Sequence, residues 1–193
     1  MKGVSQMANK VRFGVSHVYF GTYTDNNGTV TLGDPVAVPG AVSFTMDESA
    51  EKEVFWADNV AYYTYFSDEA ISAELECALF DDAFKLAFLN YVQLDDGGIA
   101  MIKGMDTKKV YMMFQGEGDK ESRRGIIYNI TPGRINREYS TTEGSKEPQT
   151  ATLSMNIDGD NNTGITRVGY PKNSSGYSSL FTTPPVPALP AAS

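Results

Sequence analysis

Apolar and polar residues alternate in several short runs of this sequence, and this period of two constrains the fold more than any other feature. In the run 71–79, apolar residues, Cys77 among them, occupy every second position, and Glu74 and Glu76 lie between them. The run 149–157 repeats the pattern. Because successive side chains of a strand point to opposite faces, both runs predict strands with one buried and one solvated face.

One stretch departs from this period. Between Phe80 and Tyr91, apolar residues recur at spacings of three and four, which indicates a helix with one apolar stripe. Asp81 or Asp82 supplies an N-cap and a negative charge to the first turn. The spacing therefore predicts one helix, over 82–90.

Turn-forming residues divide the rest of the chain into further short extended segments. In 41–47 we expect Val42 on the same side as Phe44, and we expect 165–170 to pair back onto 149–157. The other predicted strands are 10–24, 30–32, 36–38, 99–103, 110–115 and 125–130.

Many short strands with one inserted helix predict a mainly β protein, namely an antiparallel β-sandwich or partial barrel with one flanking α-helix. We expect a single domain over 1–181. The segment 182–193 is rich in proline and alanine, which predicts an extended or disordered tail.

The charge is negative overall and unevenly distributed. The chain has a formal net charge of −8, which argues against a nucleic-acid reader with a basic stripe. The segment 47–96 carries 13 acidic and 2 basic residues, whereas 103–137 carries 8 basic and 4 acidic residues. Such asymmetry suits a protein whose faces meet unlike faces of a neighbour, although a merely solvated acidic surface explains it equally well. No run of residues is long and apolar enough for a membrane span, so we expect no membrane partner.

Few residues are suited to catalysis or metal binding. His17 and Cys77 are the only histidine and cysteine, so the several ligands of a zinc site are lacking. Cys77 falls on the apolar side of its strand, where a thiol is unreactive. The segment 158–164 begins with the spacing of a calcium loop, but Thr163 replaces the required glycine, so a hairpin turn is favoured. We therefore expect no enzyme, no metal and no cofactor.

The stretch 53–67 is rich in aromatic residues on both sides of a polar turn at Asp58 and Asn59. A two-residue turn there pairs Trp56 with Ala61 and Phe55 with Tyr62. Alternation then predicts aromatic rings on both faces of the hairpin. One face carries Val54, Trp56, Ala61, Tyr63 and Tyr65, and the other carries Phe55, Tyr62, Thr64 and Phe66.

Two or three of these rings would be exposed on an isolated subunit. At roughly 150–250 Å² for each ring, the apolar patch would reach about 300–750 Å², which is large for a soluble monomer. The hairpin therefore docks on another copy, a different protein or a sugar, unless the helix or the N-terminal strand covers its second face. Docking makes five aromatic residues candidates for a subunit interface: Phe55, Trp56, Tyr62, Tyr63 and Tyr65.

These residues carry a family resemblance. The order of 11–24, 35–47 and 55–89 resembles the major tail proteins, or tail tube proteins, of long-tailed bacteriophages, in the branch common in phages of Gram-positive bacteria. The specific parts are Pro-Gly-Ala-Val-Ser at 39–43, the Ala-Asp-Asn turn at 57–59, and the acidic strand that leads into the helix. The resemblance rests on pattern and includes no catalytic signature.

The resemblance implies a tail-tube fold and a structural virion protein that assembles into stacked hexameric rings. Their inner strands form one continuous barrel, and the hollow tube conducts DNA into the host. The implied partners are further copies of the chain, a tape measure protein, the tail terminator and distal tail proteins. The implied location is the virion tail, assembled in the cytoplasm of the host bacterium. Glu74 and Glu76, on the wet face of their strand, are candidates for lumen lining.

Two other functions remain open from the residues alone. A carbohydrate-binding β-sandwich module would use the exposed aromatic rings, with Trp56 as its test position. A hydrolase with two carboxylates brought together by folding is compatible with the acidic composition, but no motif supports it.

Overall fold

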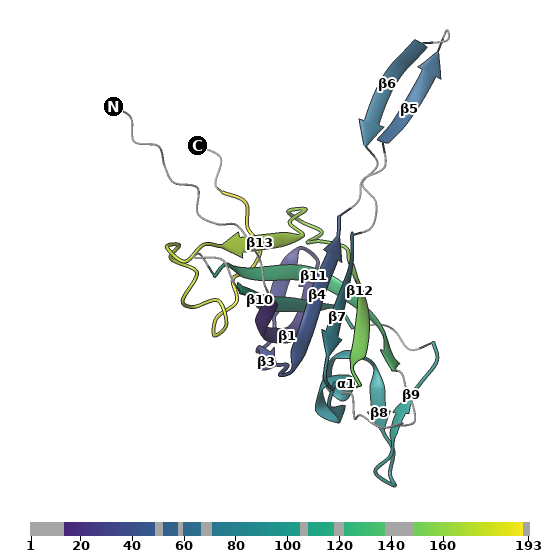
Figure 1. Cartoon of the computed structure of the whole chain (residues 1–193), viewed down its shortest axis with the longest axis vertical. Helices are drawn as coiled ribbons and strands as arrows, with labels where there is room; N and C mark the ends of the chain where they lie inside the picture. The colour runs from purple at the N-terminus through teal and green to yellow at the C-terminus, as the bar shows by residue number, and fades with distance from the viewer. Residues whose placement is uncertain are drawn as a thin grey trace, which may run out of the picture.

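The computed structural model of this chain describes residues 14–48, 52–57, 60–66, 71–104, 108–117, 122–137 and 149–190, and for 52–57 and 61–66 it describes the backbone only. Within these ranges the chain is mainly antiparallel β-structure with a single helix, which confirms the predicted fold class (Figure 1). The strands are β1 (Gly14–Asn26), β2 (Thr29–Leu32), β3 (Val36–Ala37), β4 (Ala41–Asp47), β5 (Lys52–Ala57), β6 (Val60–Phe66), β7 (Ile71–Cys77), β8 (Tyr91–Gln93), β9 (Ile99–Met101), β10 (Val110–Glu117), β11 (Arg124–Arg137), β12 (Ala151–Ile157) and β13 (Arg167–Tyr170), and the helix is α1 (Asp82–Phe88).

Nine strands form one sheet, in the order β2-β1-β10-β11-β12-β7-β4, with β3 paired to β1 and β13 paired to β11. β11 belongs to both halves of this sheet. Its first half pairs with β10 and β13, and its second half pairs with β12. Figure 1 shows the β4–β7–β12 half crossing over the half that contains β1 and β10, so the sheet folds into two layers. The described strands do not close it into a barrel.

The main core lies between these layers. Phe20 and Met112 come from one layer and Leu75, Cys77 and Leu153 from the other, and all five side chains are fully buried. Along β7 and β12 the buried residues alternate with exposed or half-exposed ones. The predicted alternation of these two strands, with Cys77 on the buried side, is therefore confirmed.

Helix α1 packs against this core at the end where β7 finishes. The carboxylate of Asp81 is the N-cap and accepts a hydrogen bond from the backbone N–H of Phe84 at 2.7 Å. Phe84 and Phe88 are buried, and the rings of Phe84 and Phe20 lie 5.2 Å apart between centroids. The helix ends before the predicted boundary, because Asn90 adopts a φ of 56° that turns the chain into β8.

Three details of the prediction were wrong. Val42 is exposed, because a register shift between Ala41 and Ser43 takes it out of the alternation. Leu79 is exposed, because β7 ends at Cys77 and the alternation ends with it. β13 pairs with β11 and not with β12, whose two edges are already occupied by β11 and β7.

Two hairpins extend from opposite ends of the molecule. β5–β6 and β8–β9 each form a two-stranded sheet of their own. Figure 1 shows β5–β6 projecting beyond the end of β4 and β7, and β8–β9 beyond the opposite end, next to α1. Within the described ranges, no helix has the length and apolar character needed to cross a membrane.

The described C-terminal segment lies along the layer that contains β11 and β13. Leu180 is fully buried, and the Tyr128 hydroxyl donates a hydrogen bond of 2.8 Å to the carbonyl oxygen of Pro185. The guanidinium of Arg124 lies 4.2 Å from the ring centroid of Tyr177 and 4.4 Å from that of Phe181. These contacts hold the segment against the rest of the subunit as far as Pro185.

Candidate functional site

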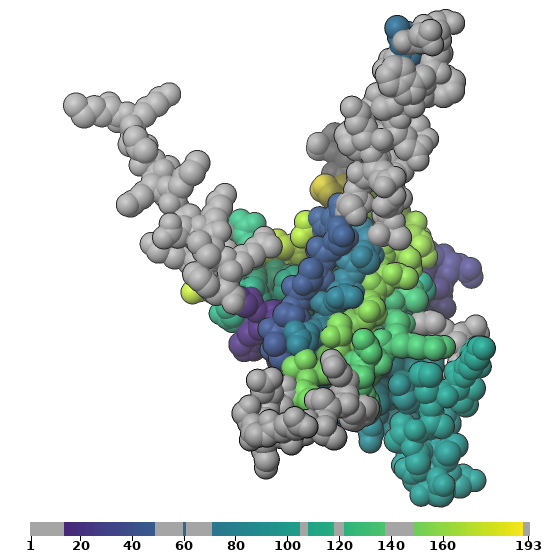
Figure 2. All heavy atoms as spheres, turned by 45° about the vertical axis from the view of Figure 1, so that its right-hand side comes forward, coloured from purple at the N-terminus to yellow at the C-terminus, as the bar shows by residue number. Residues whose placement is uncertain are grey.

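The outer surface of β4, β7, β12 and the second half of β11 carries a regular array of polar side chains, which we call the polar face. These four segments run side by side as diagonal bands in Figure 2. The strand register places the side chains in three rows, and each is exposed or half-exposed. The rows are Asp47, Ser72, Asn156 and Thr131; Thr45, Glu74, Ser154 and Arg134; and Ser43, Glu76, Thr152 and Asn136.

The polar face is acidic and hydroxyl-rich. Of the twelve side chains in its three rows, three are carboxylates and one is a guanidinium. Glu76 accepts a hydrogen bond of 2.5 Å from the Thr150 hydroxyl and one of 2.9 Å from the Ser43 hydroxyl. These two bonds, of which the one from Thr150 has the larger effect, hold the pKa of Glu76 below its ordinary value, so this carboxylate is charged at neutral pH.

Two sheet edges border the polar face. β4 pairs with β7 on one side, and among the described strands it has no partner on the other. At Ile130, β11 pairs with Val110 of β10 on one side and with Ile157 of β12 on the other. Beyond Ile130, β10 no longer accompanies β11, so the second half of β11 has no described strand on that side. Unpaired strand edges are templates for pairing with another chain.

These two edges run in opposite directions. Each neighbouring pair among β4, β7, β12 and β11 is antiparallel, so β4 and β11 are antiparallel to each other. A second copy placed beside the first, with its β4 next to β11, would continue the same antiparallel sheet. The arrangement can therefore extend the sheet from one copy to the next without a change of strand polarity.

The turn after β12 does not offer an ion site. The Asp160 carboxylate accepts hydrogen bonds from the Tyr23 hydroxyl at 2.7 Å and from the backbone N–H and hydroxyl of Thr163 at 2.7 and 2.6 Å. Its acceptor positions are used inside the protein. The prediction of a hairpin turn was wrong, because the strand that follows, β13, pairs with β11 and not with β12. No cluster of potential metal ligands occurs in the part of the chain that the structure describes.

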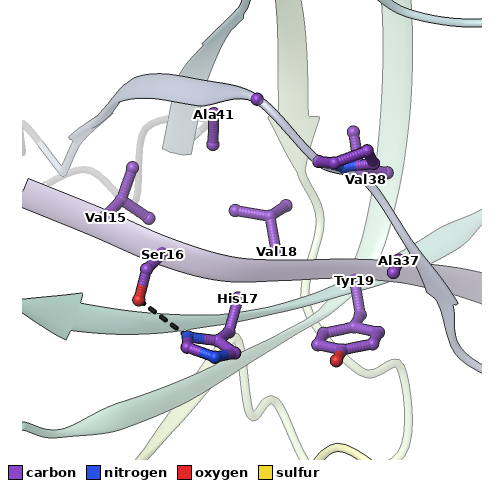
Figure 3. Close-up of a pocket in the computed structure, with 10 residues that line it drawn as sticks. Val15, Ser16, His17, Val18, Tyr19, Ala37, Val38 and Ala41 are labelled. Carbon is purple, nitrogen blue, oxygen red and sulfur yellow. Dashed lines mark hydrogen bonds between the residues drawn. The ribbon is translucent and has the colours of Figure 1, made fainter.

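A hollow of about 340 Å³ lies between β1 and the connection from β3 to β4 (Figure 3). Figure 3 shows Val15, Val18 and Ala41 pointing toward this space, whereas His17 and Tyr19 point to the other side of β1. The three side chains that Figure 3 shows pointing into the hollow are therefore apolar. His17 lies in a bulge of β1 with a φ of 50°, where its Nδ1 is 2.9 Å from the Ser16 hydroxyl. Ser16 and His17 are nevertheless among the residues that line the hollow.

The aromatic hairpin has the predicted turn position but a different register. Ala57 pairs with Val60 and Trp56 with Ala61, as expected. A register shift then pairs Phe55 with Tyr63, and the predicted pairing of Phe55 with Tyr62 was wrong. The extra residue is accommodated as an irregularity in the ladder, which alternation alone does not reveal.

The side chains of the five predicted interface residues, Phe55, Trp56, Tyr62, Tyr63 and Tyr65, lie outside the described part of the structure. Their role stays a prediction, as does the carbohydrate-binding alternative that uses the same rings. Glu74 and Glu76 are described, and both lie on the polar face at the exposed or half-exposed positions of β7.

Sequence reasoning missed the second half of β11. The predicted strand, 125–130, ends before Pro132 and Gly133, which are residues typical of turns. In the structure the strand continues through both residues, with a register shift, to Arg137. The available signal was the alternation of Ile135 with its polar neighbours after the Pro-Gly pair.

The sequence matches no protein-family model and no curated protein. Solved structures with a similar fold do exist. One is the cap of the anti-feeding prophage (AFP), described as its tube terminating cap, at a TM-score of 0.51 and 14% identity, covering 88% of this chain and 94% of that chain. This likeness shows a shared fold.

Two further structures have lower TM-scores. The sheath-tube complex of an extracellular contractile injection system, PVC, in its extended state gives 0.49 at 12% identity, covering 89% of this chain and 99% of that chain. The baseplate of the anti-feeding prophage gives a TM-score of 0.43 at 12% identity, covering 82% of this chain and 96% of that chain. At these identities, the branch of long-tailed phages remains a prediction from the sequence pattern.

Proposed function

We propose that this chain is a structural tube subunit that assembles into rings when the β4 edge of one copy pairs with the second half of β11 in the next. The observation that carries the proposal is the pair of antiparallel sheet edges on either side of one polar face. Pairing of unlike edges is a head-to-tail contact, and such contacts generate closed rings or open filaments. Ring closure pairs both of these edges, that of β4 and that of the second half of β11, in every copy.

The dimensions of such a ring are compatible with a hollow tube. Each copy contributes four strands, β4, β7, β12 and the second half of β11. Six copies, the number that the family resemblance implies, give twenty-four strands. At about 4.8 Å per strand the barrel is at least about 37 Å across, and strand tilt widens it further. Such a barrel leaves a central channel after side chains are added.

The polar face is the surface we assign to the channel. It is rich in hydroxyls and carboxylates, so it stays hydrated and repels the phosphates of DNA. Glu74 and Glu76 then line the lumen, which agrees with their exposure on β7. The opposite surface of the same strands is the core of the subunit and has no access to a channel.

Stacking of rings would use the two ends of the subunit. The projecting hairpins β5–β6 and β8–β9 lie at opposite ends of the molecule, so the two sides of a ring differ, as head-to-tail stacking requires (Figure 1). We assign Phe55, Trp56, Tyr62, Tyr63 and Tyr65 to contacts with a neighbouring subunit. Tyr63→Ala combined with Tyr65→Ala should then reduce tube formation much more than the unfolding midpoint of the subunit. A normal yield of tubes with a strongly lowered midpoint would mean that the rings belong to the core.

The remaining parts of the proposal follow from the family resemblance. The tube belongs to a virion tail assembled in the host bacterial cytoplasm, surrounds a tape measure protein, and meets a tail terminator and distal tail proteins at its ends. DNA passes through the lumen without specific binding. The subunit has a structural and non-enzymatic role.

Negative-stain electron microscopy of the purified chain, over a range of protein and salt concentrations, tests the central claim. We expect rings or tubes with a central channel. A strictly monomeric species at high concentration and at every salt condition would overturn the proposal.

A further inference from the structure

Arg134 occupies a distinctive place on the polar face. It is exposed, it lies on the β11 edge, and it is the single cation among the twelve side chains of the three rows. Asp47 is an exposed carboxylate at the end of the β4 edge. Within the described residues, neither side chain has an ion-pair or hydrogen-bond partner.

A bulge in β11 brings Arg134 to this position. Pro132 pairs with Met155 and Ile135 pairs with Leu153, so both Gly133 and Arg134 lie opposite Ser154. A Cβ atom on Gly133 would lie 2.9 Å from the Ser154 carbonyl oxygen, so this position accommodates only glycine without a shift of the backbone. The bulge therefore fixes the row in which Arg134 lies.

Arg134 and Asp47 are far apart within one copy. They lie on the two outer strands of a four-stranded layer, three strand spacings from each other, which is about 14 Å across the sheet. β7 and β12 separate them. An ion pair between them in the same subunit is therefore excluded by the distance across the sheet.

Joining the β11 edge of one copy to the β4 edge of the next brings Arg134 of the first copy close to Asp47 of the second. This step rests on the proposed ring assembly. The second half of β11 and the whole of β4 span the same rows, with Thr131 level with Asp47 and Arg137 level with Ala41. Polar side chains stay on the polar face only if the joined edges are level or staggered by an even number of residues, because a shift of one residue would move them into the core, and the tilt of barrel strands requires such a stagger. In the level register Arg134 lies directly opposite Thr45 of the next copy and diagonal to its Asp47, at about 7–8 Å between Cα atoms, and a stagger of two residues in one direction places it directly opposite Asp47.

We propose that Arg134 of one copy forms an ion pair with Asp47 of the next, and that this pair selects the partner and the register of the joined edges. A diagonal separation of this size is within the reach of an arginine side chain. Exposed ion pairs add little affinity, so the expected role is specificity: Arg134 favours β4 over another β11 edge, and Asp47 disfavours a second β4 edge. The partner is a second copy of this chain.

Charge reversal with mixing tests the proposal. Arg134→Glu places only carboxylates at the junction, and Asp47→Arg places only guanidinium groups there. We expect each variant alone to remain a folded subunit and to need at least about tenfold more protein for assembly, because like charges are brought together. In an equal mixture, alternating copies restore an opposite-charge pair at every junction, and we expect tubes to return.

Two matched variants control for net charge. Asp34→Arg and Lys172→Glu make the same charge changes at exposed positions away from both edges, and each should assemble like the unsubstituted chain. Sedimentation and negative-stain microscopy measure assembly, and circular dichroism with urea unfolding verifies that every variant is folded.

The outcomes separate the two proposals. If the unsubstituted chain forms no rings or tubes, the ring assembly and the ion pair both fail. If it assembles and Arg134→Glu or Asp47→Arg assembles equally well, the ion pair is refuted while the ring assembly stands. Loss of assembly that the mixture does not restore, or that the two control variants share, also refutes the ion pair.

Discussion

Replacing Gly133 by alanine tests the bulge that sets the row of Arg134. The new Cβ atom would lie 2.9 Å from the carbonyl oxygen of Ser154 and 3.6 Å from its carbonyl carbon. Both are backbone atoms of a paired strand, so only a movement of β11 or β12 relieves the contact. Overpacking costs about 1–3 kcal/mol, and the reduced unfolded-state entropy of alanine offsets about 0.4–1 kcal/mol of this. The two effects together allow a fall of about 0 to 2.6 kcal/mol, and because the close contacts are with backbone atoms we expect the free energy of unfolding to fall by about 1–2.5 kcal/mol.

Urea unfolding of the dissociated subunit measures this change. At a slope of about 2 kcal/mol per molar, the midpoint should fall by roughly 0.5–1.2 M. Gly169→Ala is the matched control, because Gly169 also lies on a strand paired with β11 and has no neighbouring atom within 4 Å of its Cβ position. It should raise the midpoint slightly. A Gly133→Ala midpoint equal to that of the unsubstituted chain would refute the close approach of β11 to β12.

Three further predictions concern the core and the buried ionisable groups. Phe84→Ala should lower the free energy of unfolding by about 3–5 kcal/mol, because Phe84 is 4% exposed. Leu79 is 68% exposed, so Leu79→Ala should change the free energy of unfolding by less than about 0.5 kcal/mol. Equal urea midpoints for the two variants would contradict the assignment of the core. Burial raises the pKa of Cys77 from 9.0 to about 11. The stability that this group contributes is therefore complete below pH 9 and is lost as the pH rises toward 11, so Cys77→Ala should show a shallower alkaline decline in unfolding free energy, and an identical decline would contradict the burial of the thiol. Burial alone would raise the pKa of Asp160, but hydrogen bonds from its own turn and from Tyr23 outweigh it and lower the pKa. The stability that the charged Asp160 carboxylate contributes is present above the ordinary pKa of an aspartate and is lost as the pH falls through the lowered pKa. Tyr23→Phe should therefore lessen the loss of stability in acid. An unchanged acid unfolding profile would show that the bond from Tyr23 does not form.

The elements that could be predicted from the sequence are those whose buried and exposed faces follow from the alternation within one strand or the spacing within one helix. In β7 and β12 one face meets the core and the other meets water, so alternation alone identified the strand, its buried residues and the exposure of Glu74 and Glu76. The helix was found for the same reason, because its apolar stripe packs on Phe20. In these elements the local pattern and the tertiary packing agree.

The features that could not be predicted are those that depend on how one strand pairs with its neighbour. Pro132 and Gly133 are signals of a turn in isolation, yet the close packing of Gly133 on Ser154 keeps them within β11. The exposure of Val42 and the pairing of Phe55 with Tyr63 also follow from register shifts. A shift of this kind depends on which strand lies alongside, and the alternation pattern within a single strand does not contain that information.

The two edges of the polar face differ in a way that favours contacts between unlike edges. β4 contains neither lysine nor proline, the residues that commonly protect an exposed edge, and it ends in Asp47. The β11 edge contains Pro132, which provides no N–H, and the cation Arg134. Pairing of β11 with another β11 would bring two cations together and lose a hydrogen-bond donor on both sides, whereas pairing with β4 brings opposite charges together and loses only one. The unprotected β4 edge of one copy therefore complements the protected β11 edge of another copy. A contact between two unlike surfaces of the same chain is the condition for a ring or a filament.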